Sequence, residues 1–130
     1  MATLSKEIIE TKKAPAAIGT YSQAVKSNNL LFISGQIPLD PETGEMAGDD
    51  FRTQAHQVFK NLSAIAEAAG TSLDNAIKLG VFLTDLNDFT ALNEVMPEYV
   101  KAPFPARAAI EVSALPRAAK IEIDGIIALA

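Results

Sequence analysis

The chain has 130 residues, of which 48% are hydrophobic, and a formal net charge of −5 at pH 7. This length fits one compact domain, residues 1–130, and the acidic balance argues against a nucleic-acid-binding protein, which needs a basic surface. The sequence has no cysteine and one histidine, His56, so thiol chemistry is excluded and we expect neither a metal nor a cofactor.

The sequence carries no sign of export or membrane insertion. Residues 1–13 lack the apolar run of a signal peptide. No stretch of about 20 apolar residues follows that could span a bilayer. We therefore expect a cytoplasmic protein with no membrane partner.

The first elements in chain order are short and extended. Residues 4–9 predict an edge strand, and residues 14–21 predict a loop interrupted by Pro and Gly. Residues 30–34 predict an apolar strand that stops at Gly35. The segment 40–44 predicts a turn, with Pro at the second position and Gly where a positive φ is needed.

A helix is predicted over residues 49–69. Its apolar residues recur at spacings of three and four and form a single stripe: Phe51, Ala55, Val58, Leu62, Ile65 and Ala69. Asp49 or Asp50 can cap the first turn, and Gly70 suits the left-handed position after the last one. His56 lies beside the stripe, where we expect a structural role.

The second half of the chain predicts a strand at 76–83, a second helix and two further strands, 107–114 and 120–129. The helix begins at Asp88 and continues through Phe89, Leu92 and Met96. Pro97 should kink or end it, because an interior proline costs about 3 kcal/mol.

The element order is therefore roughly βββαβαββ, an α/β domain with only two helices. The strands at 30–34 and 76–83 are apolar on both faces, so both faces of the sheet need a cover. Two helices cover one face. Another copy of the chain is the simplest cover for the second, and we infer a homo-oligomer.

The last two strands carry the most informative polar residues. Alternation places one polar set of side chains on one face of each strand: Arg107, Ala109, Glu111 and Ser113 in the first, and Lys120, Glu122 and Asp124 in the second. If these strands pair as neighbours, Arg107 can bind a carboxylate and Glu122 can take a proton from water in the same space. The pattern by itself favours a simpler interpretation, a solvated face with a structural ion pair. Tyr21, Ser34, Gly35 and Asn93 are weaker candidates for a functional role.

Several segments together resemble the RidA (YjgF) family of reactive intermediate deaminases, which share the endoribonuclease L-PSP-type fold. The resemblance covers nearly the whole chain, in order and without large insertions. The matching segments are 14–23 (APAAIGTYSQ), 34–38 (SGQIP), 81–89 (VFLTDLNDF), 105–107 (PAR), 111–112 (EV), 115–116 (LP) and 121–123 (IEI).

The resemblance implies a chorismate-mutase-like α+β fold, with a mixed six-stranded sheet, two helices on one face, and a homotrimer with ligand sites between subunits. It implies hydrolysis of 2-imino acids, such as 2-aminoacrylate or 2-aminocrotonate, to 2-keto acids and ammonia. In this interpretation Arg107 holds the substrate carboxylate and Glu122 orients or deprotonates water. The remaining positions that line the cleft are Tyr21, Ser34, Gly35, Asn93 and the backbone of Ala109.

The sequence departs from the family pattern in three places, and it leaves two other functions open. Ala109 stands where many members carry cysteine, Thr20 replaces a proline, and the segment 93–105 is short. The same cleft could serve a non-catalytic sensor of small carboxylates. RNA cleavage, attached to some relatives, fits poorly with the acidic charge and the single histidine.

Overall fold

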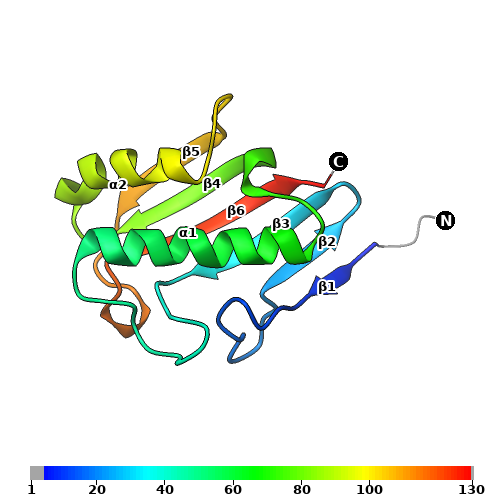
Figure 1. The fold of residues 1–130 in the computed structure, drawn as a ribbon, viewed down its shortest axis with the longest axis horizontal. Coiled ribbons are helices and arrows are strands. Elements are labelled where there is room, and N and C mark those ends of the chain that lie inside the picture. Colours follow the sequence, from blue (N-terminus) through cyan, green and yellow to red (C-terminus); the bar gives the residue numbers. More distant parts are fainter. Residues whose placement is uncertain (1–4, 130) are drawn as a thin grey trace.

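A six-stranded sheet with two helices on one face forms the fold (Figure 1). It is seen in a computed structural model that describes residues 5–129. The strands and helices are β1 (Glu7–Ile9), β2 (Ala24–Ser27), β3 (Leu30–Gln36), α1 (Phe51–Ala68), β4 (Ala76–Leu83), α2 (Phe89–Val95), β5 (Ala106–Glu111) and β6 (Ile121–Ala128). Single 3₁₀ turns lie at Leu73–Asn75, Leu86–Asp88, Met96–Glu98 and Pro116–Ala118. The expected order βββαβαββ and the α+β fold class are confirmed.

Several expected boundaries change. β2 is a strand that had no predicted range. β1 is shorter than the segment 4–9, whose first residue lies outside the described part of the chain. β3 continues through Gly35 to Gln36, so the expected stop at Gly35 is wrong. The pairing of β3 with β6 is irregular between Ile33 and Gln36, and this irregularity lets the strand pass the glycine.

The strand order is β1-β2-β3-β6-β4-β5, in which only β4 and β5 run parallel. β4 therefore lies between β5 and β6, and the expectation that the last two strands pair as neighbours is wrong. The physical reason is the connection through α2. A helix between two strands is a crossover, which returns the chain parallel and beside the strand it left.

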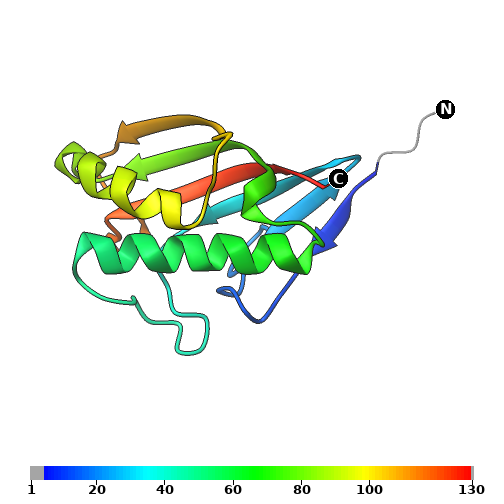
Figure 2. The same ribbon diagram turned by 45° about the horizontal axis from the view of Figure 1, so that its top comes forward.

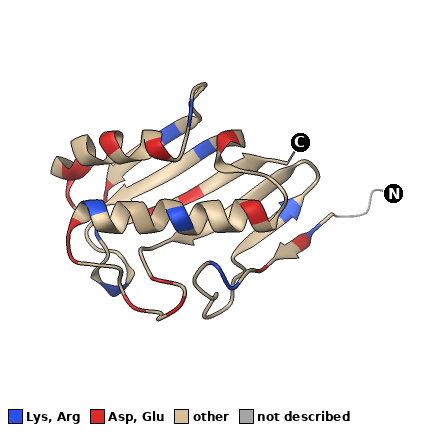
Figure 3. Cartoon of the chain, in the orientation of Figure 1, with Lys and Arg blue, Asp and Glu red and all other residues tan. Residues whose placement is uncertain are grey.

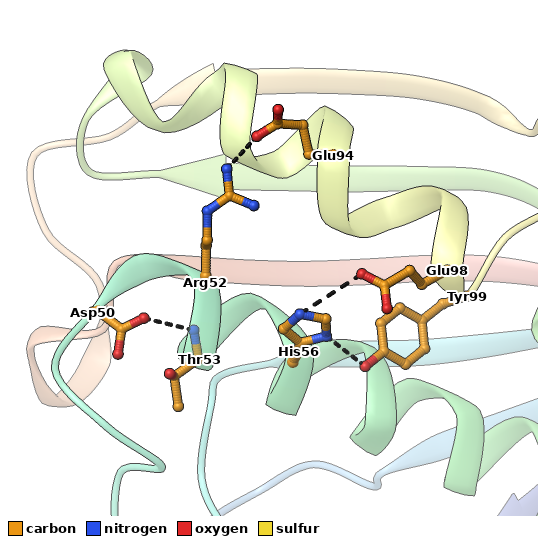
Figure 4. Close-up of polar contacts among 7 residues, drawn as sticks. All are labelled: Asp50, Arg52, Thr53, His56, Glu94, Glu98 and Tyr99. Carbon is orange, nitrogen blue, oxygen red and sulfur yellow. Dashed lines mark hydrogen bonds and ion pairs between the residues drawn. The ribbon is translucent and has the colours of Figure 1, made fainter.

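Helix α1 buries its apolar stripe against the sheet. All six residues of the predicted stripe are buried. The side chain of Asp50 caps the helix by accepting a hydrogen bond from the backbone N–H of Thr53 at 3.0 Å (Figure 4). Gly70 follows the helix with φ of +86°, as expected for a left-handed residue. No helix within residues 5–129 is long and apolar enough to cross a membrane.

Polar and aromatic contacts fasten α1 to the segment that follows Asn93 (Figure 4). Arg52 pairs with Glu94, and Nδ1 of His56 lies 2.7 Å from the hydroxyl oxygen of Tyr99. The Tyr99 ring stacks on the buried Phe59 at 5.2 Å between centroids. These contacts fix α2 and the 3₁₀ turn after it, and they give His56 a structural role.

Within residues 5–129 no helix lies over the second face of the sheet (Figure 2). Register and burial assign to this face the side chains opposite the buried set, including Phe32, Phe82, Ile110 and Ile126. Phe32 is 42% exposed and Ile110 is 50% exposed. In Figure 3 the loop that precedes α1 and the helix α2 carry Asp and Glu but no Lys or Arg, whereas α1 carries residues of both signs. We call this side of the sheet, which carries Phe32, Phe82, Ile110 and Ile126, the open face.

Candidate functional site

Arg107 lies on the helix-covered side of β5, at the edge of the sheet. Its register partner is Leu79, whose side chain is buried beneath the helices. The guanidinium Nη1 donates a hydrogen bond to Oδ1 of Asn93 at 2.8 Å and lies 3.6 Å from the sulfur of Met96. The guanidinium carbon lies over the ring of Phe89, 5.1 Å from its centroid. One short segment, α2 and the turn after it, therefore orients the arginine.

A cleft of about 430 Å³ opens beside this arginine. Its lining consists of Asn93, Met96, Pro97, Phe104, Pro105 and Arg107. The cleft thus presents one cation and one amide among apolar walls, which is the usual composition of a small-anion site. Ala109 lies two residues along the same side of β5, partly buried against the core and outside this lining.

Glu122 lies on the open face, in the middle of the sheet. Its register partner is Phe82, and its carboxylate lies against Gly35 of β3. A Cβ atom placed on Gly35 would be 2.5 Å from Oε2 of Glu122, so the glycine provides the room that the carboxylate occupies. Burial first, and then the neighbouring carboxylate of Asp124, raise the pKa of Glu122 above its ordinary value. A carboxyl of this kind exchanges protons closer to neutral pH than an exposed glutamate.

The loop before β2 forms a second hollow, of about 300 Å³, that reaches Gly35. Tyr21 lines this hollow, and its hydroxyl oxygen accepts a hydrogen bond from the N–H of Ile18 at 3.3 Å. Ser34 donates its hydroxyl proton to the carbonyl of Ser22 at 2.6 Å, which ties the loop to β3. Four of the expected site residues therefore lie near one another in the fold: Tyr21, Ser34, Gly35 and Glu122.

The expected site residues fall into two groups on opposite sides of the sheet. Arg107 and Asn93 form the cleft on the helix-covered side, while Glu122 lies on the open face with Gly35. The expectation that Arg107 and Glu122 project into the same space is thus wrong for a single chain. The cause is the register of the three strands: the odd-numbered residues of β5 share a side with the odd-numbered residues of β4 and β6, and residue 122 is even-numbered.

Sequence reasoning missed some contributors to both groups. Phe89 and Met96 entered only as apolar positions of a helix, although both contact the guanidinium of Arg107. Asp124 entered as a polar position with no role, although it raises the pKa of Glu122. The signal that was available is the spacing: Glu122 and Asp124 are two apart on one strand, so they share a face.

Among residues 5–129 no three His, Asp or Glu side chains come together in a group that could hold a metal ion. The functional groups of the candidate site are a guanidinium, an amide, a phenol, a hydroxyl and two carboxylates.

Comparison with known proteins identifies the family. A protein-family model described as Endoribonuclease L-PSP matches residues 11–129. The chain belongs to this family. The resemblance to RidA (YjgF) proteins is thereby confirmed, and the crystal structure of RidA from a Psychrobacter species supports it. That structure has a TM-score of 0.91 and 53% sequence identity, and the match covers 94% of this chain and 98% of that one.

Proteins similar to this chain differ in how far their names specify an activity. A RutC family protein of Pyrococcus horikoshii is 54% identical over 121 residues, covering 93% of this chain and 96% of the relative. The 2-iminobutanoate/2-iminopropanoate deaminase of Homo sapiens is 44% identical over 126 residues, covering 97% and 92%. The crystal structure of E. coli TdcF with bound serine has a TM-score of 0.90 and 44% identity, covering 96% and 100%.

Proposed function

We propose that the protein is a cytoplasmic homotrimer that hydrolyses small 2-imino acids to 2-keto acids and ammonia, without a cofactor. The observation that carries the proposal is the pair of complementary half-sites: a carboxylate-binding cleft at Arg107 and a proton-exchanging carboxyl at Glu122. Relatives named as 2-iminobutanoate/2-iminopropanoate deaminases support the reaction. The serine-bound neighbour supports binding of a small amino-acid-like ligand.

The opposite placement of the half-sites supports an active site between subunits. In a head-to-tail ring each subunit presents one surface to the next and a different surface to the previous one. Such a ring can bring the Arg107 cleft of one copy against the Glu122 region of its neighbour. The apolar open face supplies surface for the contact, since a second copy would bury Phe32 and Ile110.

The proposed chemistry needs few groups. Arg107 holds the substrate carboxylate through its N–H groups, and the hydrogen bond to Asn93 orients its guanidinium. Glu122 accepts a proton from water as the oxygen attacks the imine carbon, and the resulting carbinolamine is protonated on nitrogen and releases ammonia. Oxygen and protons come from one water molecule, so the products balance as keto acid and ammonia. One acid–base group of this kind accelerates a reaction by roughly 10²- to 10⁴-fold.

The assay generates 2-aminocrotonate with a threonine dehydratase and follows keto-acid release against a semicarbazide trap. We expect acceleration by the wild-type protein and loss of it in Arg107→Ala and Glu122→Gln, with oligomeric state unchanged in both. Wild-type protein that binds 2-ketobutyrate but accelerates nothing would instead indicate a sensor of small carboxylates.

Mixed oligomers test the shared site directly. Arg107→Ala and Glu122→Gln chains are each inactive, but a mixed ring contains interfaces that join the intact Glu122 of one chain to the intact Arg107 of the other. At equal mixing about a quarter of the sites are intact, so about a quarter of wild-type activity should return. Absence of any recovery in verified mixed oligomers would show that each site belongs to one chain.

A further inference from the structure

We infer that Phe89 is a positioning residue for carboxylate recognition: its ring holds the guanidinium of Arg107 ready for an anionic ligand. This inference rests on the proposed function. The guanidinium carbon lies 5.1 Å from the centroid of the Phe89 ring. A cation is attracted to the face of an aromatic ring, and the attraction strengthens where the contact is shielded from solvent.

The ring suits this task because it does not compete with the ligand. The guanidinium binds a carboxylate through N–H groups at the edge of its plane. An acidic neighbour would occupy those groups and cancel the charge, and Arg107 forms no ion pair within residues 5–129. Phe89 attracts the cation while leaving its donors free, and Asn93 takes up only one of them.

The position of Phe89 is itself fixed by the fold. Phe89 is the first residue of α2, it is partly buried, and it packs against the hydrophobic core. The ion pair between Arg52 and Glu94 ties the same helix to α1 (Figure 4). A fixed ring reduces the freedom that the long Arg107 side chain loses when a ligand binds, and that loss would otherwise reduce affinity.

The test compares substitutions at Phe89 with a control in the same helix. Phe89→Leu removes the aromatic face but keeps an apolar side chain, and Phe89→Met does so with a longer, unbranched side chain. Phe89→Tyr keeps the face. Val95→Ala makes a cavity in α2, since Val95 is 1% exposed, without removing the ring. For each variant we would measure KM and kcat, the Kd of 2-ketobutyrate by calorimetry, and Tm.

We expect Phe89→Leu and Phe89→Met to raise KM and Kd roughly three- to tenfold with kcat changed by less than about twofold. Phe89→Tyr should restore both constants to near wild type. Val95→Ala should lower Tm at least as much as Phe89→Leu while leaving KM and Kd unchanged. The split between KM and kcat separates positioning from a general loss of folded protein.

Two results would overturn the inference, and they are distinguishable from failure of the proposed function. If Arg107→Ala abolishes keto-acid binding but Phe89→Leu and Phe89→Met bind as wild type, the ring does not position the arginine. If KM rises equally in Val95→Ala, the effect belongs to helix stability. If wild-type protein neither binds 2-ketobutyrate nor accelerates imine hydrolysis, the proposed function itself fails, and the inference fails with it.

Discussion

Replacing Gly35 with alanine should lower activity strongly while leaving the fold intact. The new Cβ atom would lie 2.5 Å from Oε2, 2.9 Å from Cδ and 3.2 Å from Cγ of Glu122. Ordinary contacts begin near 3.4 Å, so the carboxylate must move by roughly 1 Å, because packed side chains do not compress. A misplacement of about 1 Å can cost on the order of 10²-fold in rate.

The expected cost in stability is small. The atoms that must move are the end of a flexible side chain, and the backbone of Gly35 does not have a positive φ. An alanine at a compatible position also restricts the unfolded chain, which stabilises the fold by about 0.4–1 kcal/mol. The free energy of unfolding, measured by urea denaturation, should therefore change by less than about 1 kcal/mol.

Gly80 offers a matched control for this prediction. A Cβ atom on Gly80 would be 2.4 Å from Oδ1 of Asp124, so the crowding is similar but falls on a different carboxylate of the same face. We expect kcat/KM for imine hydrolysis to fall roughly 10- to 100-fold in Gly35→Ala and less than about threefold in Gly80→Ala. Equal losses in the two variants, or wild-type activity in Gly35→Ala, would refute the assignment of Glu122 as the proton-exchanging group.

Three further outcomes follow from individual side chains. A raised pKa of Glu122 in the folded state means that this group stabilises the fold below its ordinary pKa of 4.5 and loses that contribution as pH rises through the folded value. The difference in free energy of unfolding between Glu122→Gln and wild type, measured by urea denaturation, should therefore shift in favour of the variant as pH rises above ~4.5. A difference that does not change with pH would contradict the raised pKa. Asp50→Ala should lower the free energy of unfolding because the cap on Thr53 is lost, and Asp50→Asn should retain most of the stability. An unchanged urea midpoint in the alanine variant would contradict the cap. Gln23 is 3% exposed and forms hydrogen bonds with the backbone N–H and C=O of Thr11. Gln23→Leu should therefore lower the free energy of unfolding by about 2–3 kcal/mol and speed amide hydrogen exchange at Thr11. Exchange at the wild-type rate would contradict this role of Gln23.

Only part of the candidate site could be predicted from the sequence. The resemblance to RidA proteins pointed to Arg107 and Glu122, and their roles remain proposals. The contact of Phe89 with the guanidinium could not be predicted from the sequence. Phe89 and Arg107 are 18 positions apart and meet only when α2 packs beside β5. The crowding of Glu122 over Gly35 likewise depends on the pairing of β3 with β6.

The sequence by itself determined the two helices, the buried stripe of α1 and most of the strands, but not β2 or the end of β3. Local periodicity, proline and glycine act within a few residues. They account for α1 and its six-residue stripe, for the end of α2 before Pro97 and for the presence of two helices. Only the tertiary structure decided which strands are neighbours, because pairing is a contact between distant segments. β4 lies between β5 and β6, and the register of these three strands places Arg107 and Glu122 on opposite sides of the sheet.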